Sequence, residues 1–271
     1  MRYRTFGRTG WKVSALGLGC MRMPNLGAPD DLDDPASIRL IRHAVDRGVN
    51  YLDSGYGYHG GRSEVVLGMA LADGYRQRVK LVTKMPTWLV KEARDFDRFL
   101  DEQLARLKTD HLDLWQVHDV RTDEDVKEIF GPRGALEAFR EARDKGAVRF
   151  IGVTGHQDPL VTKRCIEMFD FDTVLIPVNP AEPFYKSYID TVIPVASSKG
   201  MGIIAMKIYF RGFATRIPGF TGMEPFFRFA LSQPVSTAVI GCDDLRQLEE
   251  NVSFASSFTP MSRREEDELL E

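Results

Sequence analysis

The stretch Val79-Lys80-Leu81-Val82-Thr83-Lys84 shows the pattern from which the fold can be predicted. Apolar residues take successive positions in it, as is typical of a parallel strand that helices cover. Residues 94–107 follow with apolar side chains at helical spacing, and residues 112–118 form a second apolar run. A strand, an amphipathic helix and another strand predict a right-handed crossover and a parallel sheet.

The same unit recurs through the chain. Apolar runs begin about 30 residues apart, which is the spacing of an eight-stranded barrel of roughly 250 residues. Eight of them cover residues 15–20, 50–53, 79–84, 112–118, 149–154, 173–178, 202–207 and 236–241. Amphipathic segments at residues 37–47 and 136–145 each stop at a glycine, Gly48 and Gly146. This α/β pattern predicts a (β/α)8 TIM barrel, with residues 1–271 forming a single domain.

Both ends of the chain depart from the repeat. Residues 3–6 and 11–14 flank Gly7-Arg8-Thr9-Gly10, which predicts an N-terminal β-hairpin that plugs the N-terminal end of the barrel. The charged residues 262–271 predict a terminal solvated helix. No low-complexity run or shift in composition divides the chain between these two elements.

The composition excludes several classes of protein. Among 271 residues, 36 basic and 39 acidic side chains give a net charge of −3, so there is no basic footprint for nucleic acid. No apolar stretch approaches the roughly 18–20 residues that span a bilayer, and the polar N-terminus lacks a signal-peptide core. Cys20, Cys165 and Cys242 lie far apart, which argues against a thiolate metal site and is typical of a reducing compartment. We expect a cytoplasmic protein without a metal, nucleic-acid or membrane partner, and the oligomeric state stays open.

Polar side chains end several of the apolar runs. Asp53, Lys84 and His118 end the second, third and fourth runs, Thr154 ends the fifth and Lys207 the seventh. The carboxyl ends of parallel strands meet at the face of a barrel that holds the active site, so these side chains are expected to converge. A single Lys or Asp there could turn to solvent, but three ionisable groups on successive strands favour a catalytic site.

The loop after Asp53 adds two tyrosines, Tyr56 and Tyr58, among several glycines. A Tyr hydroxyl titrates at about 10 when unperturbed, too high for a proton donor and acceptor at neutral pH. A neighbouring ammonium lowers that pKa, a carboxylate holds the ammonium in place, and a histidine can hydrogen-bond a substrate oxygen. This combination suits polarisation of a carbonyl group and protonation of its oxygen.

In order and spacing, these residues resemble the aldo-keto reductase family from about residue 4 to residue 251. The family signature Asp-Thr-Ala-x-x-Tyr-Gly-x-Gly-x-Ser-Glu stands here as Asp53-Ser54-Gly55-x-x-Tyr58-His59-x-Gly61-x-Ser63-Glu64, with departures at Ser54, Gly55 and His59. The spacing selects Tyr58 over Tyr56. The segments Leu81-Val82-Thr83-Lys84 and Leu112-Asp113-Leu114-Trp115-Gln116-Val117-His118 are similar to the lysine and histidine segments of the family.

The resemblance implies a barrel enzyme that reduces aldehydes and ketones to alcohols with a nicotinamide cofactor, usually NADPH, and without a metal. It implies that Tyr58 is the general acid in reduction and the base in oxidation. It also implies that Lys84 lowers the pKa of Tyr58, that Asp53 pairs with Lys84, and that His118 orients the substrate carbonyl.

Candidate cofactor contacts come mostly from strand ends and from the last long helix. Gly17-x-Gly19 has Arg22 where a third glycine would stand, so a Rossmann phosphate loop is not supported. By resemblance, Gln247 and Asn251 contact the adenosine, beside a helix N-terminus near Asp244 that offers N–H groups to an anion. The candidates are Cys20, Met21, Asp53, Thr154, Gly155, Leu175, Met206, Lys207, Arg211, Gly241, Asp243, Gln247, Glu250 and Asn251.

Some of these positions depart from the family pattern. Thr154-Gly155-His156 replaces Ser-Asn, Leu175 stands in the place of a glutamine, and Met206-Lys207 in the place of an aromatic residue and a serine. Lys207 and Arg211 are candidates to reach the pyrophosphate. The family favours NADPH, while Asp243 and Asp244 would repel a 2′-phosphate and keep NADH as the alternative cofactor.

The substrate pocket is expected to be mostly apolar. The residues just after the strands are Met21, Met23, Tyr56, Met85, Trp88, Asp119 and Phe184. They indicate a hydrophobic small-molecule carbonyl substrate. The chain runs only a short way past the last barrel helix, which predicts an open and less selective site.

Two other functions stay open from the sequence. A cofactor-binding regulatory or redox-sensing barrel with little turnover would explain the departures at Leu175 and Met206, but it need not keep Asp53, Tyr58, Lys84 and His118. A metal-dependent hydrolase or an isomerase would need a His/Asp ligand cluster or an enolising glutamate at a strand end, and neither is apparent.

Overall fold

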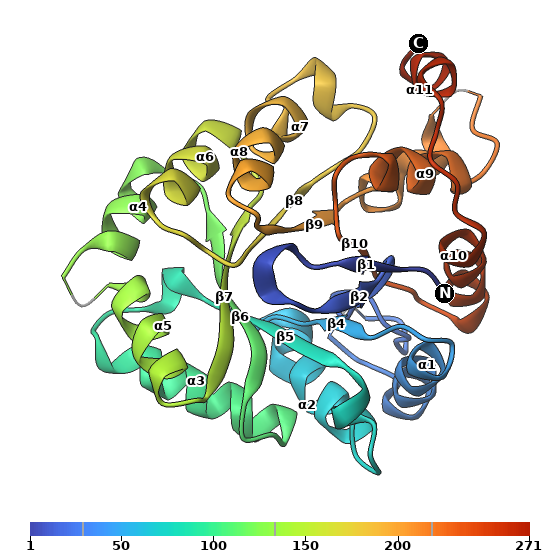
Figure 1. Cartoon of the computed structure of the whole chain (residues 1–271). Coiled ribbons are helices and arrows are strands. Elements are labelled where there is room, and N and C mark those ends of the chain that lie inside the picture. Colours follow the sequence, from blue (N-terminus) through green and yellow to red (C-terminus); the bar gives the residue numbers. More distant parts are fainter. Residues whose placement is uncertain (29, 133, 218) are drawn as a thin grey trace.

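A closed barrel of eight parallel strands forms the centre of the protein, which is described here from a computed structural model covering residues 1–28, 30–132, 134–217 and 219–271 (Figure 1). Around the barrel the strand order is β10-β3-β4-β5-β6-β7-β8-β9. The strands are β3 (Leu16–Gly19), β4 (Tyr51–Asp53), β5 (Lys80–Met85), β6 (Leu112–Val120), β7 (Val148–Gly155), β8 (Thr173–Pro177), β9 (Gly202–Met206) and β10 (Thr237–Ile240). Each of the eight predicted runs falls on one of these strands, and the predicted (β/α)8 fold is confirmed.

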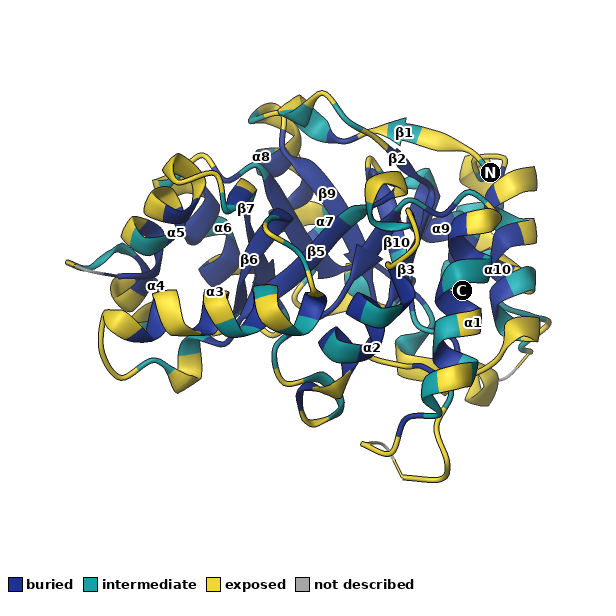
Figure 2. Cartoon of the chain, turned by 90° about the horizontal axis from the view of Figure 1, so that it is seen from below, coloured by how far each residue is buried: buried dark blue, intermediate teal, exposed yellow. Residues whose placement is uncertain are grey.

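Helices surround the barrel and cover its outer face. They are α1 (Asp34–Asp46), α2 (Arg62–Ala70), α3 (Arg94–Leu107), α4 (Asp123–Phe130), α5 (Ala135–Asp144), α6 (Pro159–Met168), α7 (Tyr188–Thr191), α8 (Ile193–Ser198), α9 (Glu224–Ser232), α10 (Leu245–Ser257) and α11 (Arg263–Leu270). Figure 2 shows buried strands inside helices whose outward faces are exposed. The predicted charged terminal helix is α11, and α4 adds a helix to the connection between β6 and α5.

Side chains alternate between the barrel interior and the outer core along each strand, as the two-residue period of a strand requires. On β6, Leu114 lies in the interior cluster, whereas Trp115 stacks on Phe139 outside, with 3.9 Å between ring centroids. Gln116 and His118 therefore face inward, above Leu114. The same alternation turns Asp53 and Lys84 into the barrel at its C-terminal end.

The N-terminal hairpin closes the opposite end of the barrel. β1 (Tyr3–Thr5) pairs antiparallel with β2 (Lys12–Ser14), and the hairpin lies across the barrel in Figure 1. Phe6 joins the interior cluster and packs on Gly202, where a Cβ would come within 2.8 Å of its ring. The hairpin thus plugs the barrel as the sequence predicts, and access to the interior is from the C-terminal end of the strands.

Within the described ranges, no helix has the length and apolar character needed to cross a membrane. The three cysteines are buried and unpaired.

Candidate active site

A buried ion pair lies at the C-terminal end of β4 and β5. The Lys84 ammonium donates hydrogen bonds to Asp53 Oδ1 and, at 2.5 Å, to the carbonyl of Ser54. Gln116 Nε2 donates to the other Asp53 oxygen at 3.3 Å. Lys84 is only 1% exposed. The Asp53 and Tyr58 groups raise the pKa of Lys84 although burial opposes this, so the ammonium stays charged.

Tyr58 lies above this pair in a short 3-10 turn, Tyr58–Gly61. The Lys84 nitrogen is 4.9 Å from the centre of the Tyr58 ring. Burial raises the pKa of the Tyr58 hydroxyl, and the charge of Lys84 works against that rise. Tyr56 points away, since its hydroxyl donates to Glu102 on α3 at 2.5 Å and its ring packs on Phe99. Only Tyr58 of the two tyrosines therefore reaches Lys84.

Gly55 makes room for the Tyr58 ring. A Cβ at position 55 would lie 2.9–3.1 Å from three atoms of that ring, closer than side chains tolerate. We expect Gly55→Ala to displace the ring by a few tenths of an ångström and to lower kcat about tenfold, because turnover depends steeply on the placement of reacting groups. Steady-state rates measure the effect. Gly57→Ala is the matched control, because a Cβ there meets nothing within 4 Å, and equal rates for the two variants would contradict the prediction.

His118 completes the group from β6. Its ring centroid lies 5.9 Å from that of Tyr58, 5.0 Å from Trp88 and 6.1 Å from His156. Burial lowers the pKa of His118 to about 3, helped by the charges of Lys84 and Arg121. The imidazole is therefore neutral at physiological pH, and its Nδ1 has no hydrogen-bond partner.

Four candidate cofactor residues lie on β7, β8 and β9, three neighbouring strands of the barrel. Thr154 and Gly155 end β7, and Thr154 Oγ1 accepts from the Asp119 amide at 2.7 Å. Leu175 is paired with Thr154 across β7 and β8. Leu175 and Met206 are both buried in the interior cluster. The departures from the family pattern at Leu175 and Met206 thus place apolar side chains in the barrel interior.

Three cations gather where the loops after β3 and β9 meet. Lys207 and Arg211 both have positive φ, at 56° and 58°. Arg22 Nη2 donates to the Arg211 carbonyl at 2.8 Å, which ties the two loops together. Burial and the charge of Arg211 lower the pKa of Lys207 to about 8. This group offers a positive surface to an anion.

The last candidate residues lie at the start of α10. The Asp243 amide donates to Gln247 Oε1 at 3.0 Å, and Asp244 caps the helix by accepting from the Gln247 amide at 2.7 Å. Asn251 Oδ1 accepts from Tyr209 at 2.6 Å. Gly241 precedes this turn, and Glu250 is exposed on the helix. Gln247 and Asn251 are thus held in place by contacts within the chain.

The remaining candidates differ in their access to the mouth of the barrel. Cys20 is buried at the end of β3 and its amide donates to the Asp53 carbonyl at 2.8 Å, while Met21 beside it is 61% exposed. Trp88 and Phe184 are exposed. Asp119 pairs with Arg121 at 2.5 Å.

Three of the residues predicted to line the pocket do not do so. Met23 and Met85 are fully buried in the outer core, and Met85 faces away from the mouth because its neighbour Lys84 faces inward. Tyr56 packs against α3, as described above. These predictions were wrong because a position just after a strand does not fix the face on which its side chain lies.

Sequence reasoning also missed Gln116, which touches Asp53. The available signal was its place two residues before His118, since that spacing puts both side chains on the same face of a strand.

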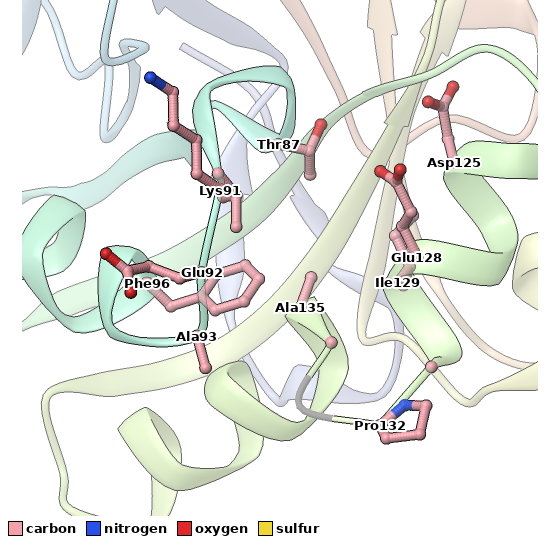
Figure 3. Close-up of a pocket in the computed structure, with 13 residues that line it drawn as sticks. Thr87, Lys91, Glu92, Ala93, Phe96, Asp125, Glu128, Ile129, Pro132 and Ala135 are labelled. Atoms are coloured by element: carbon pink, nitrogen blue, oxygen red, sulfur yellow. The ribbon is translucent and has the colours of Figure 1, made fainter.

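A cavity of about 410 Å³ lies beside this group rather than over it. Figure 3 shows Lys91, Glu92 and Phe96 on one side of the cavity and Asp125, Glu128 and Ile129 on the other. Thr87 lines it and donates to the His118 carbonyl at 3.1 Å. The cavity thus lies behind the loop that carries Trp88 to the mouth.

The mouth of the barrel carries polar atoms that suit a bound nicotinamide and a carbonyl substrate. His118 Nδ1, His156 Nε2 and Gln116 Oε1 are buried without partners. Buried polar groups are normally hydrogen-bonded, so unpaired ones at a barrel mouth favour a ligand. Within the part of the chain that the structure describes, no group of three or more His, Cys, Asp or Glu side chains could hold a metal ion.

Comparison with known proteins agrees with this geometry. The sequence model of the aldo/keto reductase family matches residues 15–218, more than half of the chain. The chain is similar to L-galactose dehydrogenase of Arabidopsis thaliana, with 24% identity over 305 residues, 97% of this chain and 91% of that protein. It is also similar to an aldo-keto reductase of Bacillus subtilis, with 28% identity over 228 residues, 79% of this chain and 64% of that protein.

Solved structures share the fold. An aldo-keto reductase from Bacillus halodurans in its holo form superposes with a TM-score of 0.81 at 22% identity, covering 100% of this chain and 97% of that one. One from Klebsiella pneumoniae, in complex with NADP and acetate, gives 0.77 at 21% identity, covering 98% and 93%. The protein therefore belongs to the aldo/keto reductase family and is an oxidoreductase that reduces carbonyl groups with a nicotinamide cofactor.

Proposed function

We propose that this protein reduces apolar aldehydes and ketones to alcohols with NADPH, using Tyr58 as the general acid. One observation carries the proposal: Asp53, Lys84, Tyr58 and His118 meet at the mouth of the barrel, with the lysine fully buried. Burying an ion pair is costly. A barrel that only bound a cofactor would gain nothing from this arrangement, so the regulatory alternative is not favoured.

Each residue has a separate role in this proposal. Tyr58 donates its proton to the carbonyl oxygen, and the Lys84 ammonium stabilises the phenolate that remains. Asp53 and the Ser54 carbonyl hold the ammonium in place. Neutral His118 donates a hydrogen bond to the same oxygen and orients the carbonyl. The reduced nicotinamide, when bound, supplies the hydride that the carbonyl carbon receives.

The residues proposed to hold the cofactor lie along one arc of the mouth. Thr154, Gly155, Leu175 and Met206 would border the nicotinamide, where the apolar Met206 side chain could contact the ring. Arg22, Lys207 and Arg211 hold the pyrophosphate, because their cations gather at one place. The start of α10, with Gly241, Asp243, Gln247, Glu250 and Asn251, holds the adenosine end. Cys20 and Met21 border the cofactor from the β3 side.

We expect NADPH to bind about tenfold more tightly than NADH, which corresponds to about 1.4 kcal/mol. The related Klebsiella pneumoniae structure contains NADP. Arg246, at the start of α10, is the cation in reach of a 2′-phosphate, although Asp243 and Asp244 oppose it. Fluorescence quenching with both cofactors measures the ratio, and Arg246→Ala should weaken NADPH alone. Tighter binding of NADH would contradict the preference.

We expect kcat/KM for reduction to stay level from about pH 5 to about pH 9. Tyr58 must be protonated to act as an acid, and its pKa is raised, so it keeps its proton throughout this range. His118 stays neutral throughout this range because its pKa is about 3, so its charge does not change with pH and does not alter the rate. Initial rates across this pH range provide the test. An inflection near the usual histidine pKa of about 6.5 that disappears in His118→Gln would contradict this account.

We infer that residues 1–271 form one domain and that the protein works in the cytoplasm on small molecules.

The exposed side chains of Trp88 and Phe184 support an apolar substrate. Specificity constants for aldehydes of increasing chain length test the substrate class, and they should rise with apolar length. A preference for short, charged aldehydes would contradict it.

A further inference from the structure

Glu64 is a fully buried carboxylate outside the catalytic group. It lies in the first turn of α2 and is 0% exposed. Its Oε1 accepts from Thr83 Oγ1 at 2.6 Å and from Gln103 Nε2 at 2.7 Å, and its Oε2 accepts from Arg106 at 3.2 Å. Burial raises the pKa of Glu64, and these three donors oppose that rise. A buried charge is expensive, so this one needs an explanation beyond ordinary packing.

One set of contacts runs from Glu64 to the lysine. Thr83 directly precedes Lys84 on β5. Gln103 Nε2 also donates to the Lys84 carbonyl at 3.0 Å, and Gln103 Oε1 accepts from Trp115 on β6 at 2.8 Å. The backbone of Lys84 is therefore held on its outer side by the same amide that binds Glu64.

A second set of contacts runs from the same helical turn to the loop that carries Tyr58. Arg106 donates to the Tyr56 carbonyl at 3.2 Å as well as to Glu64. Ser63, next to Glu64, donates to the Cys20 carbonyl at 2.8 Å and lies 2.9 Å from Ser54 Oγ. The Ser54 carbonyl accepts from the Lys84 ammonium. Lys84 and the loop that carries Tyr58 are thus both anchored to Ser63 and Glu64.

We propose that Glu64 is a positioning residue that sets the placement of Lys84 relative to Tyr58. The inference rests on the proposed function, because it concerns the same proton transfer. The side-chain partners of Glu64 in the described part of the chain are Thr83, Gln103 and Arg106, so it acts on Lys84 and Tyr58 through them.

The chemistry of the three donors requires a carboxylate at this position. A glutamine offers one acceptor oxygen and one NH₂ group. Either orientation of Glu64→Gln would set its NH₂ group against the Arg106 guanidinium or the Gln103 amide, both of which are donors. The helix turn would then shift, and the distance between Lys84 and Tyr58 would change with it.

The buried carboxylate of Asp113 provides a matched control. It is 1% exposed and accepts from Arg76 at 2.8 Å and from the Leu81 amide at 2.9 Å, so it also ties β6 to β5. It stands near the start of β6, at the far end of the strand from His118. Asp113→Asn should therefore lower stability without changing the chemistry.

The experiment compares kcat, KM, cofactor affinity and the pH profile of alcohol oxidation for Glu64→Gln and Asp113→Asn, below the melting temperature of both. We expect Glu64→Gln to lower kcat about 10- to 100-fold with cofactor affinity kept within about twofold. Oxidation needs Tyr58 as a base, so displacing Lys84 should move the rise in rate to higher pH. Asp53 and Cys20 also affect the pKa of Tyr58, and both residues are unchanged in the two variants.

Thr83→Val and Thr83→Ser keep the test interpretable if Glu64→Gln folds poorly. Valine removes only the hydroxyl, which donates to Glu64 and accepts from Gln103 at 3.0 Å, and serine retains it. We expect valine to lower kcat and serine to restore it.

Glu64→Gln could lose activity only in proportion to the fraction of unfolded protein, with an unshifted pH profile. That result would overturn the inference and leave the proposed function intact. Full turnover in Tyr58→Phe would instead overturn both, because no proton transfer from Tyr58 would remain to be positioned.

Discussion

Tyr58→Phe is expected to lower kcat for aldehyde reduction about a thousandfold, which corresponds to about 4 kcal/mol of transition-state stabilisation. Phenylalanine keeps the ring that packs between Lys84 and His118 and removes only the proton donor. Water would have to protonate the oxygen in its place. Stopped-flow or steady-state measurement of NADPH oxidation gives the change in kcat.

The variant should still bind NADPH with unchanged affinity, because the cationic group of Arg22, Lys207 and Arg211 belongs to other loops. Tyr56→Phe is the matched control, since the Tyr56 hydroxyl donates to Glu102 on α3 and leaves the active site untouched. Undiminished turnover in Tyr58→Phe, or an equal loss in Tyr56→Phe, would overturn the assignment of the acid.

Lys84→Met is expected to lower both turnover and stability. The methionine has a similar length but no charge, so the Asp53 carboxylate would be left buried with only Gln116 as a hydrogen-bond donor. Removing one partner of a buried ion pair costs about 3–5 kcal/mol, and for a chain of this size the melting temperature should fall by about 10 °C. Without the ammonium, the pKa of Tyr58 rises further and kcat for alcohol oxidation should fall at least about a hundredfold.

A double variant separates the two effects of Lys84→Met. Adding Asp53→Leu removes the unpaired charge, so we expect the melting temperature to recover in part while turnover stays low. Thermal denaturation and rate measurements on the single and double variants complete the cycle. Recovery of turnover together with stability would show that Lys84 serves only the fold.

Most of the barrel could be predicted from the sequence because buried parallel strands and amphipathic helices leave strong periodic signals. The ends of the strands were less certain. β6 continues past His118 to Val120, and α4 was not predicted as a separate helix. Short charged helices such as α4 depend on local capping, here by Thr122 and Asp125, more than on periodicity.

The four catalytic candidates could be named because motif spacing along single segments fixed them, and the structure brings those four together. The contacts between segments could not be predicted in the same way. Gln116, Glu64 and Gln103 meet their partners only once β4, β5, β6 and the helices α2 and α3 are packed. The wrong assignment of Met85 to the pocket has a similar origin, since one residue along a strand reverses the direction of its side chain.

The role of Gly55 was visible in the sequence only as a departure from the family signature. In the structure the Tyr58 ring lies within 2.9 Å of the position that a Cβ at residue 55 would take. Such a contact follows from the three-dimensional path of the loop, which no pattern of residue types reveals.

Aldehyde-dependent oxidation of NADPH by the wild-type protein, with the alcohol product quantified in the same reaction, tests the central claim most directly. The account predicts equimolar loss of NADPH and formation of alcohol, with turnover lowered about a thousandfold in Tyr58→Phe. Tight binding of NADPH with no turnover of any carbonyl compound would contradict it and point to a barrel that binds the cofactor without catalysis.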